Sequence, residues 1–248
     1  MTVNILFPVL NEHLRLERGI RRTMEYIRQD SSAAKTQYTL TILDNGSDDD
    51  TPEIGRHLAE EFPEVEYVRI EQRGVGIAFR TGVERSQADI VGYMDIDLST
   101  DISNLGKTVK IFEDNPDIMY VNASRFSKDS DTKGRKWYRK ITSKGLLILL
   151  KLVFGMKATD AICGFTFLRL ETAKELVREC SNDNGWFYMI EFLLRAEKKG
   201  IRILDMPVEW TEDYDTTVHI FKTIKNYLKN IIRLKRDFIR EGRNVKAN

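Results

Sequence analysis

Short apolar runs alternate with helix-patterned stretches along roughly the first 95 residues, and this alternation limits the possible folds more than any other feature of the sequence. The runs with the length and β-branched composition of strands cover residues 3–9, 38–43, 65–70 and 88–94. The stretches with helical spacing of apolar residues cover 12–28, 51–62 and 74–86. This alternation predicts an α/β architecture, in which a parallel sheet carries helices on both faces.

The second half is less regular, but it is expected to extend the same architecture. Helical patterns cover residues 101–114, 138–154, 171–179, 184–199 and 217–240, and strand patterns cover 118–126, 161–169 and 201–210. Residues 128–136 are interpreted as a charged loop. At 248 residues, the chain has the length of one large domain or two small ones.

Charge and cysteine content argue against several classes of protein. The net charge of +1 gives no global field for a nucleic acid, so no nucleic-acid partner is predicted. The two cysteines have neither metal-ligand spacing nor a disulfide framework, which favours a reducing compartment. The N-terminus lacks a signal-peptide pattern, and no apolar run approaches the ~20 residues that span a bilayer.

Polar residues follow the predicted strands at the ends where parallel sheets bind their ligands. These residues are Asn11 and Glu12, the turn 44–48, the segment 73–76, and Asp95 with Asp97. As strand positions i and i+2, Asp95 and Asp97 are expected to point to the same side. Two nearby carboxylates repel each other, and a hard divalent cation with open positions for phosphate oxygens relieves that repulsion. The alternative is a solvated acidic turn in which Asp97 or Ser99 caps the next helix.

Five motifs together resemble family 2 glycosyltransferases of the GT-A fold. They are Pro-Val-Leu-Asn-Glu at 8–12, Asp-Asn-Gly-Ser-Asp at 44–48, the glycine-containing segment 73–82, Asp-Ile-Asp at 95–97 and Ser-Arg-Phe at 124–126. Residues 95–100 and 160–165 are similar to polyprenyl-phosphate sugar synthases, the branch that makes dolichyl-phosphate mannose and glucose. Asn45 and Ile162 depart from that pattern, in which an acid and a Gln are usual.

The resemblance implies a GT-A catalytic domain, with a mostly parallel Rossmann-like sheet, over residues 1–215. Its nucleotide-binding half would be 1–100 and its acceptor half 101–215, followed by a basic amphipathic helix and tail at 216–248. The implied reaction is inverting, metal-dependent transfer of a hexose from a nucleotide diphosphate sugar to a polyprenyl phosphate. The donor would be of the UDP-glucose or GDP-mannose type, and the metal Mg2+ or Mn2+. The enzyme would lie peripherally at the cytoplasmic face of a membrane.

The candidate site residues fall into four groups. The catalytic candidates are Asp97, Arg125, Asp160 and Glu191. The candidates for nucleotide-sugar binding are Pro8, Leu10, Asn11, Glu12, Asp44, Asn45, Ser47, Asp48, Arg73, Gly76, Asp95 and Ile96. The candidates for the acceptor phosphate are Lys136, Arg139, Ser143 and Lys144. The candidate metal ligands are Asp95 and Asp97.

Each catalytic candidate has a plainer alternative. Arg125 is predicted to clamp a phosphate, because a guanidinium matches phosphate oxygens bidentately, but it could be a surface residue at a strand end. Asp160 is expected to orient the loop before Cys163, or else to form an ordinary turn. Glu191 could face the cleft from its helix, or it could lie on a solvated helix face. No general base is assigned, because a phosphate monoester with a second pKa of about 6 is already nucleophilic at neutral pH.

The acceptor half has the pattern expected for a lipid substrate. Basic residues at 136–144 precede the apolar run 146–154, and the last helix is basic and amphipathic. Both features fit binding at an anionic membrane surface, although core packing explains them too. Two further functions stay open: a family 2 transferase that acts on a saccharide or protein hydroxyl, and a catalytically inactive membrane-binding adaptor.

Overall fold

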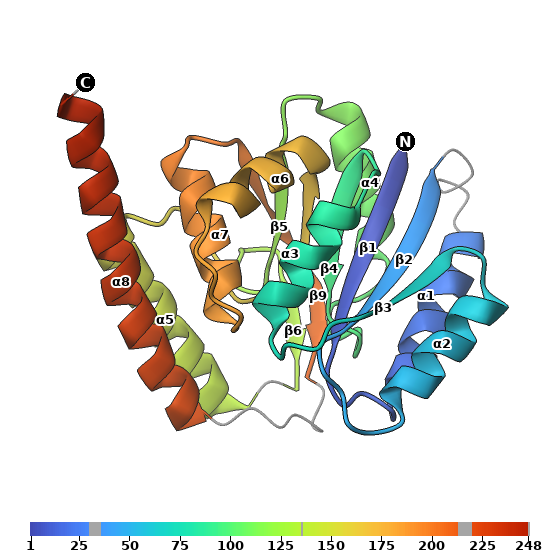
Figure 1. The fold of residues 1–248 in the computed structure, drawn as a ribbon. Coiled ribbons are helices and arrows are strands. Elements are labelled where there is room, and N and C mark those ends of the chain that lie inside the picture. Colours follow the sequence, from blue (N-terminus) through green and yellow to red (C-terminus); the bar gives the residue numbers. More distant parts are fainter. Residues whose placement is uncertain (30–35, 135, 213–219, 248) are drawn as a thin grey trace.

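A seven-stranded sheet forms the centre of the computed structural model, which describes residues 1–29, 36–134, 136–212 and 220–247. The strand order is β3-β2-β1-β4-β7-β5-β8 (Figure 1). Only β7 runs antiparallel to its neighbours β4 and β5, while the other pairs are parallel. The predicted α/β fold with a mostly parallel sheet is therefore confirmed.

The first half contains every predicted element. They are β1 (Thr2–Val9), α1 (Leu16–Gln29), β2 (Gln37–Asp44), α2 (Thr51–Glu61), β3 (Val65–Arg69), α3 (Val75–Arg85) and β4 (Ile90–Met94). Helix α1 begins four residues later than predicted. The cause is Asn11, whose φ of 58° lies in the left-handed region, and Glu12, whose backbone N–H donates to Thr51 Oγ1 at 2.8 Å. These contacts hold the start of the predicted helix as a loop.

The second half differs more from its prediction. Its elements are α4 (Asn104–Asp114), β5 (Tyr120–Ser124), β6 (Asp131–Lys133), α5 (Trp137–Phe154), β7 (Phe165–Arg169), α6 (Leu170–Glu179), α7 (Phe187–Lys198), β8 (Ile203–Pro207), β9 (Glu209–Thr211) and α8 (Ile220–Ala247). The predicted strand 201–210 is two strands, because β8 joins the main sheet while β9 pairs with β6 in a separate two-stranded sheet. The segment 128–136, predicted as a charged loop, contains β6, because residues 131–133 pair with β9.

Two hydrophobic cores lie on opposite faces of the sheet. Alternate residues of β1 show this division, since Ile5 and Phe7 face the core beneath α1, α2 and α4, whereas Leu6 faces the core beneath α3, α6 and α7. Helices α5 and α8 pack side by side at one edge of the molecule (Figure 1), and the rings of Phe154 and Phe238 join them with centroids 5.7 Å apart.

The C-terminal helix α8 is present, as predicted, and Ile231 and Leu234 bury its apolar face. Residues 216–219 and 248 of the predicted basic segment lie outside the described residues. Among the helices that the structure describes, none has the length and apolar character needed to cross a bilayer.

Candidate active site

A cavity of about 510 Å³ lies at the carboxyl end of β4, between the sheet and helices α5, α7 and α8. Charged residues gather at one end of its lining: Asp95, Asp97, Arg125, Arg139 and Glu212. Apolar residues from the three helices form another part of the lining, here called the apolar wall: Leu146, Leu149, Met189, Leu193, Leu228 and Ile231. One cavity therefore offers a charged end and an apolar wall to the same ligand.

A turn, and not the strand, brings Asp95 and Asp97 together. Strand β4 ends at Met94, and the backbone N–H of Leu98 then donates to the carbonyl of Asp95 at 3.2 Å. Leu98 has a φ of 54°, which is uncommon for a bulky residue. The Asp97 carboxylate accepts the Ser99 N–H through Oδ1 at 2.8 Å. The expectation that the two side chains extend a strand is wrong, but both line the cavity.

The surroundings of Asp95 disfavour the ionised form of its carboxyl group. Burial and the neighbouring charge of Asp97 raise the pKa of Asp95 to about 7, against the hydrogen bond from the Tyr93 hydroxyl and the charge of Arg125. A divalent cation would reverse this balance by stabilising both carboxylates. Hard cations prefer such oxygen ligands, so the pair fits Mg2+ or Mn2+. Within the described residues no set of three or more His, Cys, Asp or Glu side chains could hold a metal, so phosphate oxygens or water would complete the coordination.

Gly164 lets a neighbouring loop approach the carboxylate of Asp95 closely. The carbonyl of Gly164 accepts the Asp95 backbone N–H at 3.0 Å. A Cβ atom at Gly164 would overlap Asp95 Oδ2, so any other residue would displace the carboxylate.

Arg125 and Asp160 form a buried bidentate ion pair beside the two aspartates. Arg125 Nε donates to Asp160 Oδ2 at 2.7 Å, and a terminal guanidinium nitrogen donates to Oδ1 at 3.1 Å. Asp160 also accepts the backbone N–H of Ile162 at 3.0 Å, so it orients the loop before Cys163. Arg125 lines the cavity and Asp160 does not. The structure therefore places Asp160 where it positions the Arg125 guanidinium, and its catalytic role stays a prediction.

The four acceptor-phosphate candidates separate onto two faces of α5 and its N-terminal boundary. Arg139 and Ser143 are one helical turn apart and both line the cavity. Lys136 and Lys144 are exposed and are absent from the cavity lining. Ser143 and Lys144 separate because residues adjacent in a helix do not share a face. The role of Lys136 and Lys144 toward the acceptor phosphate stays a prediction.

The nucleotide candidates form a compact group of loops after β1 and β2. Asn11 accepts the N–H of Asp48 and donates its own N–H to Ser47 Oγ, both at 2.9 Å. Asp44 is fully buried and accepts hydrogen bonds from Tyr67 and Arg69, each at 2.7 Å. Burial acts to raise the pKa of Asp44, but its hydrogen bonds from Tyr67, Ser47 and Arg69 hold that pKa below its ordinary value.

Asn45 connects the end of β1 to the start of α3. Its side-chain amide donates to the carbonyl of Val9 at 2.7 Å, and its oxygen accepts the Gly74 N–H at 2.9 Å. A carboxylate here could not donate to Val9, which explains why an amide suits this position where the family usually has an acid. The contacts of Asn45 are structural, so we do not retain it as a nucleotide ligand.

Two other nucleotide candidates are covered by protein. Gly76 donates its N–H to the carbonyl of Asn184 at 2.8 Å, and a Cβ at this position would lie 2.5 Å from the carbonyl of Asp183. The glycines at the start of α3 thus admit the 183–184 loop and not a phosphate. The Ile96 side chain is buried in the core, and its backbone carbonyl lies so close to Gly19 of α1 that a Cβ there would overlap it.

Three exposed or half-buried candidates surround these loops. Pro8 is half-buried and Leu10 is exposed. Arg73 donates to Gly46 O at 3.2 Å and forms an exposed ion pair of 2.9 Å with Asp48. These positions are compatible with the predicted binding of the nucleotide sugar, which stays a prediction.

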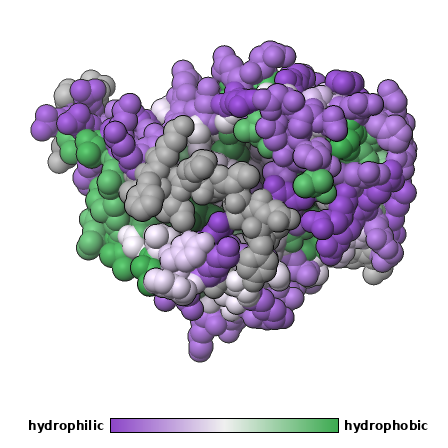
Figure 2. Space-filling view, turned by 90° about the horizontal axis from the view of Figure 1, so that it is seen from below, coloured by the Kyte–Doolittle hydropathy of each residue, from purple (hydrophilic) through white to green (hydrophobic). Residues whose placement is uncertain are grey.

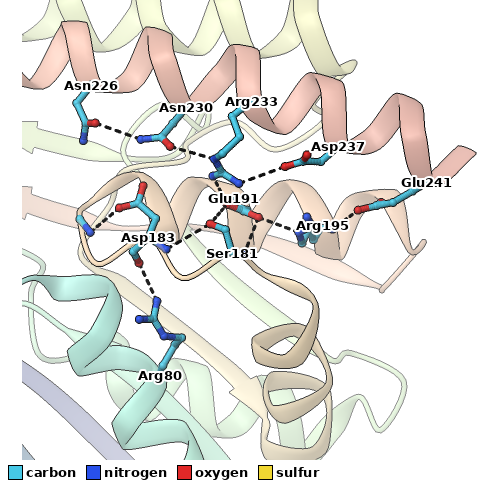
Figure 3. A network of polar contacts seen from close by, with 11 residues as sticks. Arg80, Ser181, Asp183, Glu191, Arg195, Asn226, Asn230, Arg233, Asp237 and Glu241 are labelled. Carbon is cyan, nitrogen blue, oxygen red and sulfur yellow. Dashed lines mark hydrogen bonds and ion pairs between the residues drawn. The ribbon is translucent and has the colours of Figure 1, made fainter.

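Glu191 does not face the cavity. Its buried carboxylate accepts hydrogen bonds from the Ser181 hydroxyl at 2.7 Å, Arg195 Nε at 3.0 Å and Arg233 at 2.5 Å (Figure 3). Arg195 in turn donates to Glu241 at 3.0 Å. The network joins α7 to α8, so the catalytic prediction for Glu191 is replaced by a structural interpretation.

Several residues of the cavity were not predicted as ligands. They are Tyr93, Asn122, Trp210, Glu212 and Tyr227. Trp210 lies on β9, and its ring lies 5.5 Å from the Arg125 guanidinium carbon. Glu212 and Tyr227 carry no local signal, because β9 and α8 bring them to the cavity from distant parts of the chain.

The sequence profile of glycosyl transferase family 2 matches residues 4–177. The chain belongs to this family. The chain of this family 2 enzyme is similar to glycosyltransferase AglD of Haloferax volcanii, with 29% identity over 93% of the chain but only 36% of that relative. It is 25% identical to a dolichyl-phosphate beta-glucosyltransferase of Dictyostelium discoideum, over 94% of the chain and 73% of the relative. It is 24% identical to a dolichol-phosphate mannosyltransferase of Pyrococcus furiosus, over 94% of the chain and 64% of the relative.

Solved structures support the fold of this family 2 member. Glucosyl-3-phosphoglycerate synthase from Mycobacterium tuberculosis, in complex with Mn2+, UDP-glucose and phosphoglyceric acid, superposes with a TM-score of 0.68. The match covers 94% of this chain and 79% of that chain at 16% identity. The family membership makes the protein a glycosyltransferase that uses a nucleotide sugar.

Proposed function

We propose that this enzyme transfers a hexose from a nucleotide diphosphate sugar to a polyprenyl phosphate, with inversion of the anomeric centre. The observation that carries the proposal is the cavity that joins Asp95, Asp97 and Arg125 to the apolar wall of α5, α7 and α8. A polyprenyl phosphate has this same division, with a charged head and a long hydrocarbon tail. A soluble saccharide has no apolar segment that would bury such a wall.

At the donor end, Asp95 and Asp97 would hold Mg2+ or Mn2+, which acts as a Lewis acid toward the leaving diphosphate when bound. Arg125 provides fixed positive charge at the same end. Because Asp160 holds its guanidinium in a buried bidentate pair, Arg125 needs little reorganisation during the reaction. Pro8, Leu10, Asn11, Glu12, Asp44, Ser47, Asp48 and Arg73 would surround the base and ribose.

At the acceptor end, Arg139 and Ser143 would bind the phosphate, with the tail along Leu146 and Leu149 on the same helix. The acceptor is largely a dianion above its second pKa of about 6, so it can attack without a general base. Attack from the face opposite the leaving diphosphate inverts the anomeric carbon.

Relatives of two kinds suggest the donor. The relatives include dolichyl-phosphate beta-glucosyltransferases and a dolichol-phosphate mannosyltransferase. UDP-glucose is bound in the structurally similar synthase. We therefore favour UDP-glucose over GDP-mannose as the donor.

The substrate assay is direct. The enzyme is incubated with Mn2+, labelled UDP-glucose or GDP-mannose, and either undecaprenyl phosphate or undecaprenol. Label is expected in the organic phase only with undecaprenyl phosphate, and more strongly from UDP-glucose. Transfer to soluble sugars with no lipid product would support the saccharide alternative and overturn the proposal, as would donor binding without any transfer.

We also propose that the enzyme works at the cytoplasmic face of an anionic membrane. An apolar stripe runs along the outer faces of α5 and α8, with the exposed residues Trp137, Ile141, Ile148, Leu152, Ile232 and Ile239. Figure 2 has hydrophobic residues gathered along the edge where these helices lie in Figure 1. Exposed lysines accompany the stripe, among them Lys140, Lys144, Lys151 and Lys229. Exposed apolar residues flanked by lysines suit an anionic lipid surface, and the free Cys163 and Cys180 suit a reducing compartment.

Replacing Leu152 by Glu is expected to weaken binding to vesicles of phosphatidylglycerol and phosphatidylcholine by about tenfold. Leu152 is 80% exposed, and burying a leucine in lipid contributes roughly 1.5–3 kcal/mol. Vesicle sedimentation measures the partition. Leu14→Glu is the matched control, because Leu14 is 78% exposed but precedes α1 on the other side of the sheet. Equal binding by both variants would reject this membrane face.

A further inference from the structure

The acceptor end of the cavity contains an ion pair between Arg139 and Glu212. A terminal nitrogen of the Arg139 guanidinium lies 2.8 Å from Glu212 Oε1. Arg139 comes from α5, and Glu212 follows β9, where its backbone N–H donates to the carbonyl of Lys133 at 3.1 Å. The side chain of Glu212 is only 2% exposed, although both residues line the cavity. A negative charge thus lies at the place proposed for the acceptor phosphate.

Each residue of this ion pair has a buried polar atom without a hydrogen-bond partner among the described residues. These atoms are Arg139 Nε and Glu212 Oε2. Buried polar atoms are nearly always paired, and an incompletely paired buried ion pair recovers less of its desolvation cost. By contrast, the neighbouring Arg125–Asp160 pair uses both carboxylate oxygens. The Arg139–Glu212 pair is therefore the easier of the two to open.

We propose that Glu212 competes with the acceptor phosphate for Arg139, and that this competition selects phosphates that carry an apolar tail. The inference rests on the proposed function. A guanidinium binds carboxylate and phosphate with the same geometry, so the two anions exclude each other. Free phosphate must displace Glu212 from Arg139 without burying any apolar surface that would offset the lost ion pair. A polyprenyl phosphate also buries its tail against α5, α7 and α8, which offsets the displacement.

Glu212→Gln removes the competing charge at nearly constant volume. It is expected to lower the KM for undecaprenyl phosphate, and the inhibition constant of inorganic phosphate, each about tenfold. The KM for the nucleotide sugar stays unchanged. Glu209→Gln is the matched control, because Glu209 lies on β9 itself, is exposed, and pairs with Lys107 outside this cavity. This control removes the same charge and is expected to change neither constant.

The effect must depend on Arg139. In an Arg139→Gln background, Glu212→Gln is expected to give no gain in phosphate affinity, and a purely structural role for Glu212 would not produce this dependence. Thermal midpoints of all variants establish that each is folded. If Glu212→Gln instead raises the acceptor KM, or if its gain persists without Arg139, the inference is overturned.

Failure of the proposed function is recognised separately. A wild-type enzyme that makes no lipid-linked sugar contradicts the function. A binding assay tests the competition without turnover. The fluorescence of the cavity residues Trp186 and Trp210 reports the binding of inorganic phosphate or farnesyl phosphate. In that assay, Glu212→Gln is expected to tighten inorganic phosphate binding about tenfold, and identical affinities for wild type and variant would reject the competition.

Discussion

Asp97→Asn is expected to lower kcat for sugar transfer by about 10²- to 10³-fold while the protein stays folded. The fold should persist because an Asn oxygen can accept the Ser99 N–H that Asp97 Oδ1 accepts at 2.8 Å. The loss should be large because one of the two carboxylates proposed for the metal is removed, and groups that stabilise a leaving-group charge each contribute on this scale. Initial rates at saturating Mn2+ and donor measure the effect.

A second measurement separates metal binding from chemistry. In wild type, Mn2+ with UDP should raise the thermal midpoint, because a ligand of the native state stabilises it. Asp97→Asn should lose that increase. Asp101→Asn is the control, because Asp101 is exposed on the same segment and its carboxylate accepts the Ser103 N–H at 2.8 Å, which an Asn oxygen can also do. Full activity of Asp97→Asn with Mn2+ present would remove Asp97 from the metal site.

The fold of the first half was predictable because β1, β2 and β4 are buried on both faces over most of their length. Such strands appear as continuous apolar runs, and the helices between them have clear periodicity. The segment 201–210 gives no comparable signal. Pro207 ends β8, and the next strand belongs to a different sheet, whose partner β6 is only three residues long. Which sheet a short strand joins depends on tertiary contacts that local pattern does not record.

The site was predictable where chemistry coincides with strand ends or one helix face. Asp95, Asp97, Arg125, Arg139 and Ser143 meet in one cavity on that basis. The failures share a different cause, since distant segments supply the deciding contacts. The loop at 183–184 covers Gly76, and α8 brings Arg233 to Glu191. Neither contact leaves a mark in the sequence around the residue that it occupies.

The buried ionic network around Glu191 helps to place α8 against the cavity. Helix α8 contributes Tyr227, Leu228 and Ile231 to the cavity, so its placement sets the shape of the apolar wall. Arg233 on the same helix binds Glu191, which α7 carries. The network therefore holds α8 in the position that shapes the apolar wall. Its loss should lower the free energy of unfolding more than it lowers kcat.

Glu191→Gln is expected to lower the free energy of unfolding by about 1.5–3 kcal/mol, because the hydrogen bonds from Arg195 and Arg233 lose their charged acceptor. Each arginine keeps a second carboxylate partner, Glu241 for Arg195 and Asp237 for Arg233. Burial acts to raise the pKa of Glu191, but hydrogen bonds from Arg233 and Ser181 hold that pKa below its ordinary value near 4.5. A carboxyl with a depressed pKa in the folded state stabilises the protein above its unfolded pKa. That contribution disappears as the pH falls through the folded value. The difference between wild type and variant should thus be constant from about pH 6 to 8 and shrink below about pH 4.

Urea unfolding across this pH range measures the difference, with Glu171→Gln on the exposed start of α6 as the control. The control should unfold like wild type at every pH. At temperatures where Glu191→Gln is still folded, its kcat should fall far less than that of Asp97→Asn, because its carboxylate contacts Ser181, Arg195 and Arg233 and does not line the cavity. A variant with wild-type stability but no transfer would instead restore Glu191 as a catalytic residue and require α7 to rotate it toward the substrate.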